Sequence, residues 1–432
     1  MSGLRLKECK ELTERLPVQE AALPTRVVLP LQQSLGCPND PIVNVGDEVA
    51  EGQKIADTQK TVAAPLHAPI SGRIIAIDNL PNACQYPVAS LVIEAIPGRE
   101  SQGLVGSHWQ VDEFTPEQIR KVVREAGIVG LGGATFPTHV KLSPSKPIDT
   151  VIINGCECEP YITADHRLML ERPAELLEGA RAIARAVGAE NIIVAVENNK
   201  QDAVQVLLDH NKNHNLKIVV LPSIYPQGGE KVLIRKLLGR EVPSGGLPLD
   251  IGVIVNNVGT AVAIADALKT GRPLIKRVVT ITGSGVKKPR NLLARIGTSF
   301  AELLAQCGGI TDDAAKIIMG GPMTGLAVAS LDMPVVKGTN CLLVLNQRDA
   351  RDYEEKGCIR CGRCVRACPV GLLPNFLADF AKLRDYEKLV DYHLADCIEC
   401  GCCAYVCPSR IYLVQYFKGA KQELKTRRAV CR

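Results

Sequence analysis

Between residues 115 and 268 the spacing of apolar positions alternates between a helical period and short continuous runs. The helical periods cover residues 115–126, 173–187 and 202–211, and the apolar runs cover residues 150–153, 191–196, 217–221 and 252–256. Helices that alternate with apolar strands are typical of a parallel sheet covered by helices. We therefore predict a Rossmann-like α/β domain in this part of the chain, with bounds at residues 111–268.

The segment before this domain has short strand-like stretches and many turn residues over positions 25–97. Its parts at 45–53 and 68–74 resemble the half-motifs of lipoyl and biotinyl carrier domains, which fold as flattened β-barrels. A carrier needs a modifiable lysine at the hairpin tip between the two halves. Lys60 lies near that tip but lacks the acidic or methionine neighbours found in carriers. We therefore predict a structural barrel-sandwich hybrid over residues 1–110.

The part of the chain after the α/β domain divides into two. Residues 277–345 return to short strands around one helical segment at 299–307, which predicts a β-grasp domain over residues 269–349. Residues 350–432 contain a doubled cysteine run, the only internal repeat that we find, within a helical pattern. The insert between the two runs, residues 372–394, is predicted to be helical. The predicted fold is therefore multidomain, α/β plus β, with a helical C-terminal domain.

Composition narrows the function classes further. The chain has 432 residues, 46% hydrophobic and 4% aromatic, so its cores must be aliphatic. A net charge of +5 without a basic stretch interleaved with aromatic residues does not favour nucleic-acid binding. No signal peptide or apolar run of about 20 residues is present. We therefore expect a reducing cytoplasm, and any attachment to a membrane must come from other proteins.

The two cysteine runs carry the strongest chemical signal. Both have the spacing Cys-x2-Cys-x2-Cys-x3-Cys-Pro, which is typical of bacterial ferredoxins with two clusters. In that arrangement the fourth cysteine of each run binds the other cluster. One [4Fe–4S] centre is then held by Cys358, Cys361, Cys364 and Cys407, and the second by Cys397, Cys400, Cys403 and Cys368. Zinc and disulfides are the rival interpretations, but zinc usually takes two separated pairs. Cys402 is out of register and is predicted to be a bystander.

Four polar loops in the α/β domain follow or precede its strands, at residues 127–141, 154–160, 225–231 and 256–260. The first is rich in glycine but is neither a Walker A loop nor a dinucleotide fingerprint. Polar clusters just after strand ends are where α/β sheets bind ligands. Acidic and amide groups there can bond to ribityl hydroxyls and flavin edges. For Cys156 and Cys158 we favour packing or site-lining roles over metal binding.

The four loops, in this order, resemble the flavin site of the NADH-binding subunit of respiratory complex I. The chain departs from that pattern at Cys156, Gly229 and Gly259. FMN is expected rather than FAD, because one phosphate-type loop is present and no adenine-binding fingerprint is, and Lys141 could neutralise the phosphate. With this resemblance, NADH is expected to stack on the flavin against Phe136, with acidic side chains near the dinucleotide. The implied cofactor-binding residues are Gly130, Gly132, Gly133, Phe136, Lys141, Asn154, Glu157, Glu159, Gly228, Glu230, Asn256, Asn257 and Thr260. No residue is expected to act as a catalytic acid or base.

The order of the four domains narrows the resemblance. The domain order is similar to that of the C subunits of Rnf complexes, and so are the sequence motifs at residues 132–141, 157–161, 242–248 and 320–323. Membership implies a peripheral subunit, on the cytoplasmic face of a cell membrane, of a complex that couples ferredoxin:NAD+ electron transfer to Na+ or H+ transport. The implied partners are the other subunits, NADH and, indirectly, ferredoxin.

Other functions remain open at this point. The related cobalamin reductase of bacterial microcompartments is the nearest alternative, but its barrel-sandwich segment follows the flavin domain. A scaffold with an inactive flavin pocket and a ligand-sensing module built on the β-grasp unit belong to other classes. Retention of flavin after purification would distinguish an active subunit from a scaffold whose flavin pocket is inactive.

Overall fold

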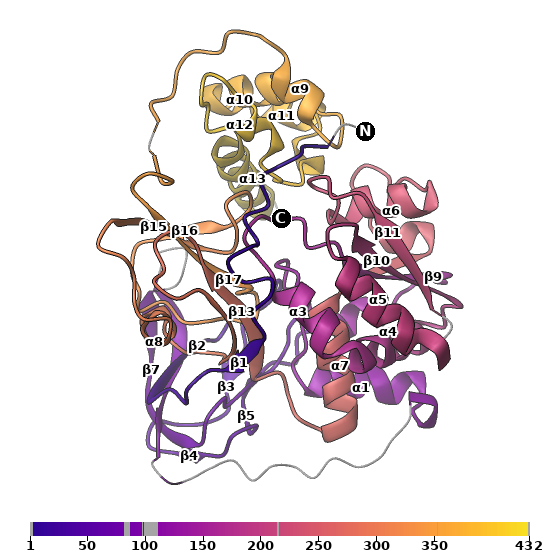
Figure 1. Cartoon of the computed structure of the whole chain (residues 1–432), viewed down its shortest axis with the longest axis vertical. Helices are drawn as coiled ribbons and strands as arrows, with labels where there is room; N and C mark the ends of the chain where they lie inside the picture. Colours follow the sequence, from indigo (N-terminus) through magenta and orange to yellow (C-terminus); the bar gives the residue numbers. More distant parts are fainter. Residues whose placement is uncertain are drawn as a thin grey trace.

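A computed structural model describes residues 3–81, 87–96, 98, 111–213, 216–351 and 353–430. Figure 1 shows the α/β domain on one side, the β-rich domains on the other, and the helical C-terminal domain above them. The dark N-terminal segment runs from the helical domain down to strand β1. Among the described residues, no helix combines the length and apolar character needed to cross a membrane.

The α/β domain contains the predicted parallel sheet. Its four strands lie in the order β11-β10-β9-β12, and every neighbouring pair is parallel. The strands are β9 (Thr150–Gly155), β10 (Asn191–Glu197), β11 (Lys217–Leu221) and β12 (Val253–Asn257). The helices are α1 (Pro116–Glu125), α2 (Thr138–Lys141), α3 (Ala164–Glu171), α4 (Pro173–Val187), α5 (Gln201–His210), α6 (Glu230–Leu238) and α7 (Val258–Thr270), with short 3-10 turns at Val111–Glu113, Asn211–Asn213 and Pro248–Ile251. Parallel order brings the carboxyl ends of the strands, and the polar loops, to one edge.

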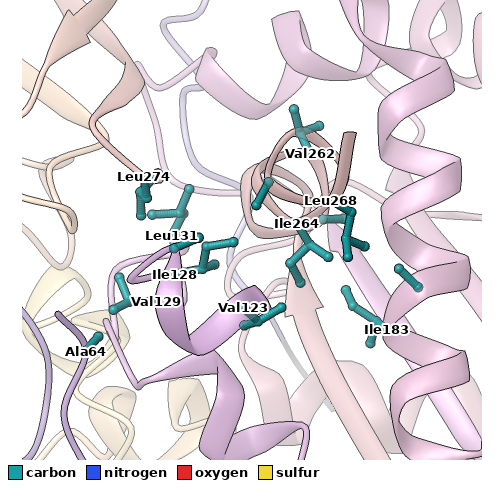
Figure 2. Packing of buried hydrophobic residues seen from close by; sticks show 14 of the residues in the cluster. Ala64, Val123, Ile128, Val129, Leu131, Ile183, Val262, Ile264, Leu268 and Leu274 are labelled. Carbon is teal, nitrogen blue, oxygen red and sulfur yellow. The ribbon is translucent and has the colours of Figure 1, made fainter. Parts of the chain in front are cut away.

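A single apolar core joins this domain to the barrel-sandwich. Figure 2 shows Val262, Ile264 and Leu268 of α7 packed near Ile183 of α4 and Val123 of α1. The residues at the root of the glycine-rich loop belong to the same core, and so does a residue of the barrel-sandwich. These are Ile128, Val129, Leu131 and Ala64. The loop is thus anchored by burial although its tip is exposed.

The barrel-sandwich consists of two sheets, ordered β2-β8-β7-β4 and β3-β5-β6. Its strands are β2 (Arg26–Pro30), β3 (Asp40–Pro41), β4 (Glu48–Val49), β5 (Lys54–Asp57), β6 (Leu66–His67), β7 (Gly72–Pro81) and β8 (Pro87–Ala95). The two half-motifs pair, since Glu48 lies opposite Arg73 in the β4–β7 ladder. The hairpin that carries the exposed Lys60 packs near the glycine-rich loop, because His139 Nε2 lies 3.2 Å from the Thr61 carbonyl oxygen.

The β-grasp domain is a six-stranded mixed sheet in the order β1-β14-β13-β17-β15-β16. Its elements are β13 (Lys276–Thr282), β14 (Arg290–Arg295), α8 (Phe300–Gln306), β15 (Ala314–Met319), β16 (Leu326–Val328) and β17 (Cys341–Asn346). Strand β1 (Val18–Glu20) comes from the N-terminal segment and pairs with β14. The segment before residue 25, which we grouped with the barrel-sandwich, therefore completes the edge of a different sheet.

The C-terminal domain is helical, as predicted, and the insert between the cysteine runs is also helical, divided into two helices. They are α10 (Pro374–Leu383) and α11 (Tyr386–Asp391). Arg384 adopts φ +55° between them, and the Asp385 side chain accepts a hydrogen bond from Lys388 N. This cap begins a new helix in the middle of the apolar period. The remaining helices are α9 (Arg363–Ala367), α12 (Cys402–Tyr405) and α13 (Leu413–Val430), with a 3-10 turn at Leu394–Asp396.

A buried lysine ties three domains together. Lys337 of the β-grasp domain donates hydrogen bonds from Nζ to the Pro65 carbonyl in the barrel-sandwich, at 2.8 Å, and to the Gly127 carbonyl at the root of the glycine-rich loop, at 2.6 Å. Its side chain is almost completely buried. Burial, and then the nearby Arg124, lowers the pKa of Lys337 to about 7. The three domains are therefore joined by hydrogen bonds from a lysine side chain whose charge can be lost near neutral pH.

We predict opposite effects for two helical glycine-to-alanine changes. A Cβ at Gly179 in α4 would lie 1.9 Å from the Ala261 carbonyl oxygen of α7, whereas a Cβ at Gly419 in α13 meets nothing within 4 Å. Gly179→Ala should destabilise the protein by roughly 1–3 kcal/mol because the helices must separate. Gly419→Ala should stabilise its helix by up to about 1 kcal/mol. Thermal melting of both variants tests this, and equal shifts would contradict the close packing.

We also predict that Lys337→Met flattens the dependence of stability on alkaline pH. The folded-state pKa of about 7 lies below the ordinary 10.5. Between these values the unfolded chain holds a proton that the folded chain has lost, so stability rises with pH. The variant should lose a slope of up to ~1.4 kcal/mol per pH unit. Melting from pH 7 to 10 measures it, and the exposed-site control Lys287→Met should keep the wild-type slope.

Candidate functional site

The glycine-rich loop closes on itself and exposes its backbone. Gly130 N donates to the Phe136 carbonyl at 2.9 Å, and Thr135 N donates to the Gly130 carbonyl at 3.2 Å. Gly132 and Gly133 at the tip are exposed, whereas Phe136 is half-buried. A loop without side chains at its tip lets a flat ring or a phosphate approach the main chain.

The first turn of α7 forms a hydrogen bond and close contacts with the glycine-rich loop. Leu131 N donates to Thr260 Oγ1 at 2.9 Å, and the Asn257 side chain caps the helix by accepting from Gly259 N at 2.8 Å. A Cβ at Gly132 would lie 3.3 Å from the Asn257 Cβ. Thr260 and Asn257, predicted as cofactor contacts, thus position the loop in the structure.

Lys141 and Glu230 meet at the edge of the sheet. Lys141 Nζ lies 2.9 Å from Glu230 Oε1 and also donates to the carbonyl of Val255 in β12. Both side chains are partly exposed, at 29% and 41%. Glu230 is the first residue of α6, so a partly accessible ammonium group stands beside a helix N-terminus. Both features attract negative charge, which the Glu230 carboxylate supplies in this structure, so a phosphate bound here would share the Lys141 ammonium group with Glu230.

The loops after β9 and before α6 are joined by Asn154. Its Nδ2 donates to the Gly228 carbonyl at 2.8 Å, and its Oδ1 accepts from Cys156 N at 3.1 Å. A Cβ at Gly228 would lie 2.3 Å from the Cys156 carbonyl oxygen. The glycine is therefore required by the close approach of two backbones.

The carboxylates of Glu157 and Glu159 are engaged within the chain. Glu157 accepts from Asp165 N at 2.7 Å at the start of α3, and its Oε2 lies 4.0 Å from Lys10 Nζ. Glu159 accepts from Met323 N at 2.7 Å and from the backbone of the next residue in the β-grasp domain. Both side chains thus hold neighbouring segments, and their contact with a dinucleotide stays a prediction.

Sequence reasoning missed Asp165, Arg277 and Lys10. Asp165 Oδ2 accepts from Asn257 Nδ2 at 2.6 Å; burial, with the charge of Glu157 second, raises the Asp165 pKa to about 7. The buried Arg277 donates to the Leu131 carbonyl at 3.4 Å. Asp165 lies on the first turn of a helix, 164–171, that no apolar period predicted, and Arg277 and Lys10 come from other domains. Near these three residues, the only feature of the sequence that could have indicated a role was the charge of each side chain.

Some buried polar atoms at these loops have no hydrogen-bond partner. They are Asn256 Nδ2, Gln227 Nε2 and Thr138 Oγ1. An unpaired buried polar group costs about 1–3 kcal/mol. A ligand rich in acceptors would satisfy such donors, and FMN brings a phosphate, ribityl hydroxyls and ring oxygens. The donor set therefore fits FMN.

The cysteines gather in two cavities, and each cavity contains one of the predicted ligand sets. The first is lined by Cys358, Cys361, Cys364 and Cys407. The second is lined by Cys368, Cys397, Cys400 and Cys403, and also by Cys402. Across the described parts of the chain, no three His, Cys, Asp or Glu side chains come close enough to hold a single metal ion. Thiols that surround a space rather than a point fit a cluster better than zinc.

The second cavity lies against the α/β domain. Tyr225 Oη donates to the Cys400 carbonyl at 2.6 Å, and Tyr225 packs in an apolar cluster that also contains Cys158 and Cys402. Ile398 Cδ1 lies 3.5 Å from a Cβ built on Gly229. Asp396, just before the run, accepts from Gly245 N at 3.2 Å. The second cysteine run is thus fixed to the loops at the predicted flavin site.

Comparisons with known proteins support the same division of the chain. Family models match four consecutive parts. These are the RnfC barrel sandwich hybrid domain at residues 1–96, the Nuo51 FMN-binding domain at 123–266, the SLBB domain at 278–327 and the 4Fe-4S dicluster domain at 357–411. The barrel-sandwich precedes the flavin domain, as expected for the C subunits of Rnf complexes. In the cobalamin reductases it is expected to follow the flavin domain.

Whole-chain relatives agree. The C subunit of the proton-translocating ferredoxin:NAD(+) oxidoreductase complex of Clostridium ljungdahlii is 43% identical, over 98% of this chain and 93% of its own length. The C subunit of the Na(+)-translocating complex of Acetobacterium woodii is 42% identical, over 97% and 95%. An NAD+-reducing [NiFe]-hydrogenase structure shares the fold, with TM-score 0.50 and 22% identity over 66% of this chain and 55% of that one. The chain therefore belongs to the family of C subunits of ion-translocating ferredoxin:NAD+ oxidoreductase (Rnf) complexes.

Proposed function

We propose that this chain exchanges a hydride between NAD(H) and FMN and relays single electrons through two [4Fe–4S] clusters to other subunits of a membrane-bound complex. Partner subunits would couple this transfer to the transport of Na+ or H+. A flavin converts a two-electron hydride transfer into single-electron steps, which iron–sulfur clusters require. The observation that carries the proposal is the contact between Tyr225 and Cys400, which holds one cysteine cavity against the flavin loops.

Each group of residues has a role in this function. The exposed tip at Gly132 and Gly133 receives the ring or phosphate, and Lys141 supplies positive charge for the phosphate. Asn256 and Gln227 offer buried donors without a hydrogen-bond partner at these loops. Glu157 and Glu159 keep the loops in place from behind. The protein contributes position and electrostatics, and no side chain need act as an acid or base.

The eight run cysteines are proposed as ligands in the two crossed sets that line the cavities. The set around Cys400 then accepts electrons from the flavin site, and the set around Cys361 passes them outward. Attachment on the cytoplasmic side of the membrane is part of the proposal. It is supported by the disulfide-free cysteines of the described residues, which suit a reducing compartment.

Ligand substitution in each run tests the proposed order. Cys361→Ser should leave NADH able to reduce the remaining centre near Cys400, because that centre still lies against the flavin loops. Cys400→Ser should prevent NADH from reducing the centre near Cys361, although dithionite still reduces it. Electron paramagnetic resonance of anaerobic protein measures both, with iron content as the control. Equal behaviour of the two variants towards NADH would contradict the order, and wild-type protein that retains no flavin would identify an inactive scaffold.

A second experiment tests the phosphate site. Lys141→Met should weaken FMN binding by about tenfold to a hundredfold, because a hydrogen bond to a charged group is lost. Riboflavin has no phosphate, so its affinity should not change. Fluorescence titration of flavin-free protein measures both ligands. The matched control is Lys146→Met, which removes a nearby lysine that is paired with Asp250. An equal loss for riboflavin would mean that the variant disturbs the pocket instead of the phosphate contact.

A further inference from the structure

The two cysteine runs differ in how they are covered. In the second run Cys402 and Cys403 are buried, and a Cβ at Gly401 would lie 2.8 Å from the carbonyl oxygen of Met323 in the β-grasp domain. In the first run Cys358 and Cys361 are exposed, and the side chain of Ile359 between them is 67% exposed. The second cavity therefore faces the rest of the chain, whereas the first lies at the surface.

The two runs also differ in charge. Residues 356–368 contain one lysine, three arginines and no carboxylate. These cations are Lys356, Arg360, Arg363 and Arg366, and all are exposed. Residues 397–407 contain no cation and one carboxylate, Glu399, which lies 2.8 Å from Lys421 Nζ. Lys421 also donates to the Cys397 carbonyl at 2.6 Å, so the second run has one cation beside its one carboxylate, whereas four cations lie within the exposed run.

A groove of about 490 Å³ lies beside the exposed run. Its walls include Arg363, Arg366, Arg410, Tyr405 and the backbone of the N-terminal segment at Leu4, and it reaches Cys407 of the first cavity. The guanidinium of Arg410 lies 4.1 Å from the centre of the Tyr353 ring, and Arg366 Nη2 donates to the Cys361 carbonyl at 3.4 Å. Two of the cations are therefore held in position by the domain itself.

Among the described carboxylates near this surface, that of Glu355 is engaged by other groups, whereas Glu354 is exposed two residues before Lys356. Glu355 is paired with Lys382 and accepts from the Tyr416 hydroxyl at 3.1 Å. Asp379 lines the first cavity together with Lys382. The cations of residues 356–368 and Arg410 thus outnumber the acidic groups around them. Arginine forks bind carboxylates in pairs of hydrogen bonds, which favours acidic protein surfaces.

We propose that this first-run face, made of Lys356, Ile359, Arg360, Arg363, Arg366 and Arg410, is the docking site for an electron-transfer protein that presents carboxylates around its own one-electron centre. The exposed Ile359 and Tyr405 provide apolar contacts between the charges, as at the centre of specific interfaces. The partner receives the electron directly from the cavity beneath the face. This inference rests on the proposed relay, and it adds where the electron leaves the chain and the charge of the protein that takes it.

The test uses the anaerobic holo-protein and two one-electron probe proteins of opposite charge, a small acidic ferredoxin and the basic cytochrome c. The affinity of the acidic probe should fall steeply with salt, because the attraction is electrostatic. Arg360→Glu/Arg363→Glu should weaken that affinity by about tenfold or more, and should speed the oxidation by cytochrome c of protein that has been reduced with dithionite and freed of the excess. The control Lys287→Glu/Lys288→Glu makes the same change of charge on the β-grasp domain and should match the wild type.

Two outcomes would overturn the docking site: an acidic-probe affinity independent of salt, or equal effects of the two double variants. Retained iron content and dithionite reduction exclude a folding defect in the Arg360→Glu/Arg363→Glu protein. Dithionite reduces the clusters without NADH, so failure of NADH to reduce the wild-type clusters would refute the proposed relay alone. Loss of probe binding with intact NADH reduction of the clusters would support the docking site.

Discussion

The contact between the second cysteine run and the α/β domain is the constraint on which the rest of the structure depends. A one-electron relay works only if its centres stay close together, so this contact must be rigid. Tyr225 bonds to the Cys400 carbonyl on one side and exchanges two backbone hydrogen bonds of 2.8 Å with Leu4 on the other. The N-terminal segment and the β-grasp loop at Met323 close around the same place. Four separate parts of the chain therefore meet where electrons have to pass.

Buried charged side chains stabilise the loops of the α/β domain that contact the second cysteine run. Lys10 comes from the N-terminal segment and donates to the Glu159 carbonyl at 3.0 Å, while its ammonium group lies near Glu157. Lys200 and Glu197 form a second buried pair, 3.0 Å apart. Removing one member of a buried pair leaves an uncompensated charge, which is strongly destabilising. The polar residues behind the flavin loops thus fix the geometry that the exposed glycines use.

Local patterns were sufficient for the parallel sheet and the paired half-motifs of the barrel, because period and spacing are properties of short segments. The two crossed cysteine sets stay a prediction, which the lining of the two cavities supports. Long-range partners were not predictable in this way. The motif around Glu157 suggested a ligand contact, but its carboxylate bonds to the start of α3, a helix whose short period carried no signal. Likewise, nothing near Val18 indicated pairing with β14, almost three hundred residues away. The helical pattern of the insert did not reveal the break at Arg384, where the backbone adopts φ +55°.

The unequal covering of the two cysteine runs has an energetic consequence. Reduction adds a negative charge to an iron–sulfur centre, and its potential depends on nearby charge and on exposure to water. Cations and solvent around the first run both stabilise that added charge. The second run has less of both, since its cysteines are more buried and its one neighbouring cation, Lys421, is paired with Glu399. With the proposed ligand sets, the centre at the first run would therefore be the easier of the two to reduce, and an added electron would favour the end of the chain that faces solvent.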